Sequence, residues 1–292
     1  MPTSMRRTPA LLRATRPRQW TKNVLVIAAP LAAGVVDEAS AQLAIVGAFV
    51  AFTLCAAAVY LVNDVLDVDA DRRHPRKQHR PVATGELSVV TALVAAAVCA
   101  VVALPIGFLV DVHLGITLAV YLGIQLAYTA WLKEQPVIDL AIVSAGFLLR
   151  AIAGGVAVDV PLSQWFLLVA GFGSLFMVAG KRYSELHSVG KDAGTRRTLE
   201  LYSESYLRFV WSLAAAVTIT AYSLWAFEIA STSGVNWQAI SIAPFVLGLL
   251  RYAVDVDQGL AGEPEDAVLR DPVLQAIAGV WLLVFAIGVY VR

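Results

Sequence analysis

The sequence predicts an all-α, polytopic membrane protein with about nine transmembrane helices. Of its 292 residues, 59% are hydrophobic and 15% are charged, and the mean hydropathy is +0.71. The apolar residues gather in blocks of about 20, the length that a helix needs to cross the hydrocarbon core. Charge also alternates between successive loops. These observations indicate one integral-membrane domain, residues 1–292, and exclude a soluble globular fold.

Nine apolar segments are expected to cross the membrane: 20–37, 40–63, 87–109, 113–132, 137–157, 161–181, 206–228, 236–254 and 273–291. The first is the weakest because Lys22 and Asn23 shorten its apolar part. Residues 1–19 are basic and lack a small-residue cleavage site after an apolar core, so we interpret them as a cytoplasmic arm. Cys55 and Cys99 lie inside apolar segments and are interpreted as packing residues.

Charge is distributed unequally between the two faces that nine spans would create. The arm and the loops after even-numbered spans hold 20 of the 22 Lys and Arg residues. The opposite loops carry only acidic charge, at Asp37, Glu38, Asp111, Asp159 and Glu228. The positive-inside rule then places the arm and the loops 64–86, 182–205 and 255–272 in the cytoplasm. The predicted location is the cell (inner) membrane, with multiple passes.

The most informative segment is the acidic run from Asn63 to Asp71, at the end of the second apolar block. A helix turns about 100° per residue, so Asp64, Asp67 and Asp71 fall within roughly 60° of one another, whereas Asp69 points elsewhere. Three converging carboxylates repel each other unless a cation lies between them. Oxygen ligands suit Mg²⁺, which usually also holds substrate phosphates.

A basic run follows, and it includes Lys77 and Arg80. We interpret the whole segment as a Mg²⁺-diphosphate site: Asp64, Asp67 and Asp71 hold the metal, Asn63 donates a hydrogen bond, and the cations neutralise the remaining oxygens. The alternative is a solvated helix end with a positive-inside loop. That alternative explains the basic residues but gives no reason for the spacing of the acids.

Two further constellations allow more than one interpretation. Lys181, Arg182 and Glu185 follow the sixth apolar block; Lys181 and Glu185 share a helix face, as in an ordinary salt bridge, or the cations bind a second phosphate with Glu185 near the metal. Lys22 lies in a basic and aromatic segment that is either an interface anchor or a holder of a membrane-embedded phosphate.

Arg150 lies within the fifth apolar block. Asp139 precedes it by three helical turns on the same face. A charged residue at this depth is either functional or part of a buried structural pair.

Several motifs together identify a family. They are Arg-Pro-x-Gln-Trp-x-Lys-Asn at 16–23, the acidic run at 63–71, Arg-Pro-x-Ala-x-Gly at 80–85, Tyr128-Thr129 with Lys133, and the stretch from Asp139 to Arg150. In this combination the chain resembles the UbiA superfamily of intramembrane prenyltransferases over nearly its whole length. The resemblance implies the UbiA-type helical bundle and adds Tyr128 and Lys133 to the substrate-binding residues.

One departure from the family pattern narrows the function. Superfamily members that use a prenyl diphosphate have a second aspartate-rich motif after the sixth helix, where this chain has Lys181-Arg182-Tyr183-Ser184-Glu185. With these residues the chain is similar to the decaprenyl-phosphate phosphoribosyltransferase subgroup. The resemblance implies a Mg²⁺-dependent glycosyltransferase that moves 5-phosphoribosyl from phosphoribosyl pyrophosphate to a polyprenyl (decaprenyl) phosphate. The resemblance also implies the product, decaprenylphosphoryl-5-phosphoribose, for cell-wall arabinan (arabinogalactan) synthesis.

This donor has two anionic ends, so Lys181 and Arg182 are assigned to its 5-phosphate, and Lys22 and Arg150 to the acceptor phosphate. Two alternatives stay open: a UbiA-type prenyltransferase with a prenyl diphosphate donor and an aromatic acceptor, and a lipid or solute transporter. We expect the membrane, and no nucleic acid, as a partner. The Ala- and Gly-rich helices permit a homo-oligomer.

Overall fold

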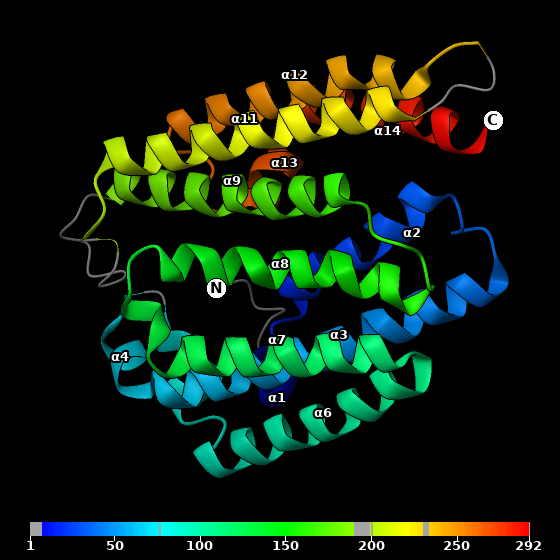
Figure 1. Ribbon diagram of the computed structural model, residues 1–292. Helices are drawn as coiled ribbons and strands as arrows, with labels where there is room; N and C mark the ends of the chain where they lie inside the picture. The colour runs from blue at the N-terminus through cyan, green and yellow to red at the C-terminus, as the bar shows by residue number, and fades with distance from the viewer. Residues whose placement is uncertain (1–7, 76, 190–198, 200, 230–233, 292) are drawn as a thin grey trace. The chain divides into compact units, whose positions relative to one another are not determined.

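The computed structural model describes residues 8–75, 77–189, 199, 201–229 and 234–291 (Figure 1). Regular structure in these ranges is helical, which confirms the all-α prediction. Eight helices are long and apolar enough to cross a membrane. They are α3 (Ala39–Leu66), α6 (Val89–Val110), α7 (Val112–Ala130), α8 (Ile138–Ala157), α9 (Gln164–Val189), α11 (Glu204–Glu228), α12 (Trp237–Asp257) and α14 (Pro272–Tyr290).

The first expected span, 20–37, has a different structure. It begins within a 3₁₀ helix, η2 (Pro17–Ile27), continues as the short α2 (Ala28–Ala33) and turns at Gly34, where φ is +76°. Two features oppose a regular α-helix here: Asn23 is fully buried with its amide bonded to other elements, and Pro30 lacks a backbone N–H. The chain therefore has eight candidate spans in its described part, close to the predicted nine.

The chain folds into two compact units, and the first comprises 1–31, 35–135 and 149–161. In this unit α3 packs against both α6 and α7. Small side chains on α3, including Ala48, Ala51 and Cys55, are buried in this packing, which allows the helices to approach closely. Three short elements contact α3: α1 (Ala10–Ala14), α4 (Val68–Arg73) and α5 (Pro81–Thr84). The short η3 (Lys77–His79) contacts α4 and α5, and η4 (Leu132–Glu134) follows α7.

The second unit comprises 32–34, 136–148 and 162–292. Here α9 packs along α11, and α12 packs against both α11 and α14 (Figure 1). Aromatic rings in contact join α11, α12 and α14: Tyr222 stacks on Phe245, which lies against the tilted ring of Trp281. From the sequence, residues 1–292 are expected to act as one catalytic domain, and this stays a prediction.

The predicted cytoplasmic loops contain helical turns of their own. The loop 64–86 includes α4, η3 and α5, and the loop 255–272 includes α13 (Pro264–Arg270). Helix α9 runs on to Val189, past the predicted end at 181, so Lys181 and Glu185 lie on a helix. Residues 1–7 of the arm, residue 76, and residues 190–198 and 200 of the loop 182–205 lie outside the described residues.

Candidate active site

The acidic run keeps a nearly helical course, although α3 itself ends at Leu66. Asp67 lies at the junction with α4, where φ is −95° and ψ is 6°, and the Asp71 N–H still donates to the Asp67 carbonyl at 2.7 Å. Asp64 and Asp71 are each only 2% exposed. Asp69 is exposed and pairs with Arg72 at 3.2 Å, so it lies apart from the other acids, as the helical spacing predicts.

Each of the three predicted metal carboxylates is bound by a cation of the first unit. Arg80 donates through one nitrogen, Nη1, to Asp64 Oδ1 at 3.2 Å and to Asp71 Oδ2 at 2.6 Å. Arg16 also donates to Asp64. Lys133 donates to Asp67. These pairs balance three acidic charges with three basic ones, and the three cations come from three different parts of the chain.

A cation lies between two of the three carboxylates: Arg80 contacts both Asp64 and Asp71, where its guanidinium reduces their mutual repulsion. Within the described ranges, no group of three or more His, Cys, Asp or Glu side chains is gathered closely enough to hold a metal ion. The expectation that Asp64, Asp67 and Asp71 together hold a metal ion therefore stays a prediction.

Burial raises the pKa of Asp71 above its ordinary value, and the neighbouring charge of Asp64 adds to this. The contact with Arg80 opposes the rise without cancelling it. The ionised carboxylate is thus poorly solvated in this position and gains from a nearby cation.

The donor set fits Mg²⁺ by its chemistry. Asp64, Asp67 and Asp71 offer only oxygen, the preferred ligand of this ion. One cation, Arg80, already touches two of these carboxylates, so their oxygens lie within reach of a shared positive charge. The half-buried Asn63 lies beside them at the end of α3.

Arg16 also contacts the acidic site, although the sequence indicated it only as part of the motif at 16–23. Its backbone is left-handed, with φ at +53°, which is uncommon for a residue other than glycine. Its guanidinium lies 4.7 Å from the centre of the Tyr60 ring while donating to Asp64. Arg16-Pro17 gave no signal for this conformation, because proline favours an extended backbone for the preceding residue.

Arg150 and Asn23 form a buried polar connection inside the first unit. Arg150 donates through Nε to Asn23 Oδ1 at 2.7 Å and through Nη2 to the Tyr121 hydroxyl at 3.1 Å. Its guanidinium also lies over the rings of Phe52 and Tyr121. Asn23 in turn donates to the Thr53 hydroxyl at 3.0 Å. These contacts fix η2 against α3 and α8.

The suggested pairing of Arg150 with Asp139 is not formed. Eleven residues of helix separate their Cα atoms by about 16 Å, too far for an ion pair. Asp139 is bonded instead to Arg182 and Tyr202 within the second unit.

Two described cations of the second unit, Lys181 and Arg182, are also engaged with carboxylates. Arg182 is 3% exposed, and its guanidinium contacts Asp139 at 3.5 Å and Glu185 at 3.4 Å. Lys181 is more accessible and contacts Glu263 at 2.9 Å and Glu185 at 3.8 Å. Lys181 and Glu185 therefore share a face, as the spacing predicts.

Tyr202 holds the start of α8 in the second unit. Its hydroxyl donates to Asp139 and accepts the Val137 N–H at 2.7 Å. Burial and the bond to Asp139 raise the pKa of the Tyr202 hydroxyl, which therefore stays protonated. Val137 has φ at +69°, a strained conformation for a β-branched residue, so this hydrogen bond stabilises an unusual turn.

The remaining predicted residues, Lys22, Lys77 and Tyr128, are half-buried in the first unit. Lys77 donates its backbone N–H to His74 Nδ1 at 3.3 Å. Their roles toward a substrate stay predictions.

Comparison with known proteins identifies relatives along most of the chain. A protein named decaprenyl-phosphate phosphoribosyltransferase from Mycobacterium tuberculosis is 52% identical over 277 residues, covering 93% of this chain and 91% of that protein. A Corynebacterium glutamicum protein of the same name is 48% identical over 290 residues, covering 96% and 87%.

The fold also matches solved structures. A UbiA homologue from Archaeoglobus fulgidus, bound to DMAPP and Mg²⁺, superposes with a TM-score of 0.75 at 18% identity, covering 97% of this chain and 99% of that one. The model of the UbiA prenyltransferase family matches residues 24–269. The chain therefore belongs to the UbiA prenyltransferase family.

Proposed function

We propose that this membrane enzyme transfers the 5-phosphoribosyl group from phosphoribosyl pyrophosphate to a polyprenyl phosphate, with decaprenyl phosphate as the acceptor. The product is decaprenylphosphoryl-5-phosphoribose, a lipid-linked sugar for cell-wall arabinan, and diphosphate is released. The observation that carries the proposal is identity of about 50% to proteins named for this activity, along nearly the full length of both chains.

The charges of the second unit support this donor. A prenyl diphosphate has an apolar tail where phosphoribosyl pyrophosphate has a second phosphate, and cations suit the second phosphate. Lys181 and Arg182 stand where prenyl-transferring relatives have a second acidic motif. We assign Lys181, the more accessible of the two, to the 5-phosphate, with Arg182 and Glu185 fixing its surroundings through their ion pairs.

In the first unit, Asp64, Asp67 and Asp71 would hold Mg²⁺ together with the donor's diphosphate. The bound ion supplies positive charge to the oxygens of the departing diphosphate. Asn63 donates to the same group. Arg80, Lys133 and Lys77 neutralise the charge that remains, and Tyr128 contacts the donor beside them.

The chemistry requires one bond to break and one to form at C1 of the ribose. The C1–O bond to diphosphate breaks, and diphosphate keeps the electron pair. A phosphate oxygen of the lipid attacks the opposite face of an oxocarbenium-like transition state, which inverts the anomeric centre. The attacking phosphate is already ionised at neutral pH, so the protein supplies charge and position rather than a general base.

Lys22 and Arg150 are the candidates for the acceptor phosphate. Lys22 is half-buried on η2, whereas Arg150 is buried and bonded to Asn23 and Tyr121. We therefore assign the direct contact to Lys22, with Arg150 positioning η2. We further propose that the enzyme lies in the cell membrane with its carboxylates toward the cytoplasm, where the basic loops are placed by the positive-inside rule.

The test measures lipid-linked radioactivity from labelled phosphoribosyl pyrophosphate, decaprenyl phosphate and Mg²⁺ with the purified protein. Asp67→Asn is expected to lower kcat/KM by about a hundredfold or more, because it removes a ligand of the charge-stabilising ion. Asp69→Asn is the matched control, since Asp69 is exposed and paired with Arg72. No lipid-linked product from the wild type, or equal loss in both variants, would contradict the proposal.

A further inference from the structure

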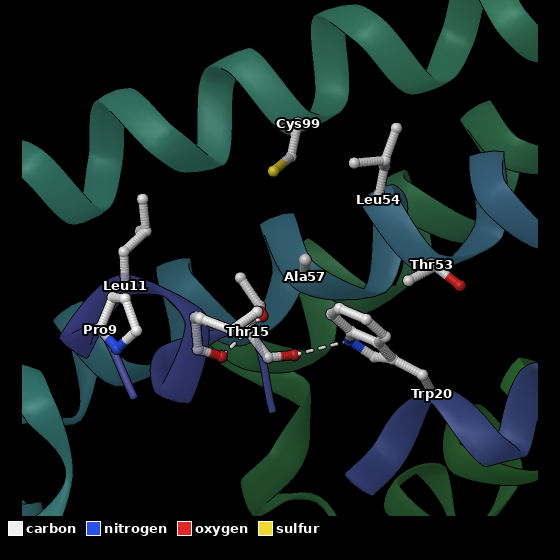
Figure 2. A pocket seen from close by; sticks show the side chains of 9 residues that line it. Pro9, Leu11, Thr15, Trp20, Thr53, Leu54, Ala57 and Cys99 are labelled. Carbon is white, nitrogen blue, oxygen red and sulfur yellow. Dashed lines mark hydrogen bonds between the residues drawn. The ribbon is translucent and has the colours of Figure 1, made fainter. Parts of the chain in front are cut away.

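An apolar groove lies beside the N-terminal arm in the first unit (Figure 2). Its volume is about 370 Å³, within the usual range for small-molecule sites. The arm provides one wall through Pro9, Leu11, Leu12 and Thr15, and Trp20 of η2 continues it. Helix α3 provides Thr53, Leu54 and Ala57, and α6 provides Cys99.

The few polar groups of the lining already have partners. The Thr15 hydroxyl donates to the Leu12 carbonyl at 2.9 Å, and the Thr53 hydroxyl donates to the Phe49 carbonyl at 2.7 Å. Trp20 Nε1 donates to the Thr15 carbonyl at 3.1 Å, as the dashed line in Figure 2 shows. The groove therefore offers apolar contact to an occupant and little hydrogen bonding.

The groove shares a face of α3 with the acidic site. Thr53, Ala57, Tyr60 and Asp64 are spaced by four, three and four residues, so they form one stripe along the helix. Ala57 lines the groove, and Asp64 lies two turns further on, about 10 Å along the axis. Arg16 lies in between, over the Tyr60 ring and bonded to Asp64.

We propose that this groove binds the phosphate-proximal isoprene units of the polyprenyl phosphate acceptor and directs its head group along α3 toward Asp64. The inference rests on the proposed function for the identity of the lipid. The arm carries Arg13, Arg16 and Arg18, whose positive charge suits an anionic head, although Arg13 also pairs with Glu86 and Arg16 with Asp64. The apolar walls complement the chain. The N-terminal arm is then a substrate-binding element as well as a membrane anchor.

The chemistry distinguishes this lipid from a bilayer phospholipid. In a polyprenyl phosphate the phosphate is attached directly to the end of the hydrocarbon chain. In a phospholipid, a glycerol unit and ester carbonyls stand between phosphate and chain. Their polar atoms would enter a groove whose own polar groups are already bonded, which carries a desolvation cost.

The first experiment uses the full-length protein in nanodiscs of phosphatidylcholine and phosphatidylglycerol, with no donor present. The probe is a polyprenyl phosphate that carries a diazirine on its second isoprene unit. After photolysis, mass spectrometry is expected to find labels on groove residues such as Leu12, Leu54 or Cys99. Unlabelled polyprenyl phosphate should suppress these labels, and phosphatidic acid should not. Labels elsewhere, or equal suppression by phosphatidic acid, would overturn the inference.

The second experiment fills the groove. Cys99→Phe is expected to reduce the labelling and to raise KM for polyprenyl phosphate about tenfold, with KM for the donor unchanged, because the added ring occupies the space of the chain. Val98→Phe is the matched control, since Val98 is on the same helix and 56% exposed. Equal effects in the two variants would overturn the inference. Thermal unfolding of both variants separates loss of binding from loss of folding.

The two proposals fail in different ways. Labelling of the groove without any transfer from phosphoribosyl pyrophosphate would leave this inference standing and overturn the proposed function. Transfer to lipid with labelling outside the groove would do the reverse.

Discussion

Replacing Arg80 tests whether the carboxylates of the acidic run depend on a positive charge between them. In Arg80→Gln, Asp64 and Asp71 lose contacts of 3.2 and 2.6 Å while remaining in a site where their side chains are only 1% and 2% exposed. Removing one member of a buried ion pair costs about 3–5 kcal/mol. Arg80 is 22% exposed and Arg16 still contacts Asp64, so we expect about 2–3 kcal/mol.

The assay is thermal unfolding of the detergent-solubilised protein, followed by tryptophan fluorescence without and with Mg²⁺. The expected loss corresponds to a fall in Tm of about 5–10 °C without the metal, for a chain of this size. Arg73→Gln is the control, because this substitution removes the same charge from an exposed position in the neighbouring turn of α4.

Mg²⁺ should restore much of the stability of Arg80→Gln, since a ligand that binds only the folded state stabilises it and the carboxylates no longer have Arg80 as a competitor. It should raise the Tm of Arg73→Gln no more than that of the wild type. The reasoning is refuted if Arg80→Gln unfolds at the same temperature as Arg73→Gln, or if Mg²⁺ raises the Tm of both by the same amount.

Two further predictions concern the fold around the site. Gly154→Ala should lower stability by about 3 kcal/mol or more in a denaturant titration, because its Cβ would overlap the Val26 carbonyl oxygen. Gly123→Ala, with open space around it, should cost almost nothing. The hydrogen bond from Arg251 lowers the pKa of Asp271 below its ordinary value of 3.8. The ionised Asp271 therefore stabilises the fold above pH 3.8, and this stability is lost as the pH falls through the lowered pKa. Asp271→Asn should therefore flatten the fall of Tm between about pH 4.5 and 3, and an unchanged pH profile would contradict this.

The membrane helices could be predicted from sequence because their signal is local. Blocks of apolar residues define α3, α6 and the later spans. The three- and four-residue spacing of Asp64, Asp67 and Asp71 places them on one helix face without tertiary information. The isolation of Asp69 follows from the same periodicity, and the structure bears it out.

The partners of these acids could not be predicted in the same way. Arg16 and Asp64 are 48 residues apart, and Lys133 and Asp67 are 66 apart. Such pairs depend on how helices pack, which local periodicity does not specify.

The first predicted span and Arg150 also show what the sequence alone could not predict. The hydropathy of residues 20–37 suggests a helix. In the structure, the buried Asn23 accepts a hydrogen bond from Arg150 and donates one to Thr53, and it lies in a tighter 3₁₀ segment. The sequence indicated that Arg150 is either functional or part of a buried pair. Its partners lie far away in the sequence, so the sequence could not identify them.

The most direct test of the proposed function is a donor competition assay with the wild-type protein in its membrane environment. Labelled phosphoribosyl pyrophosphate, decaprenyl phosphate and Mg²⁺ are incubated with an excess of unlabelled phosphoribosyl pyrophosphate or of a prenyl diphosphate. We predict lipid-linked label that requires Mg²⁺, is suppressed by the unlabelled sugar donor and is little affected by the prenyl diphosphate. Transfer of the prenyl group to an aromatic acceptor, with no label from the sugar donor reaching lipid, would contradict the account.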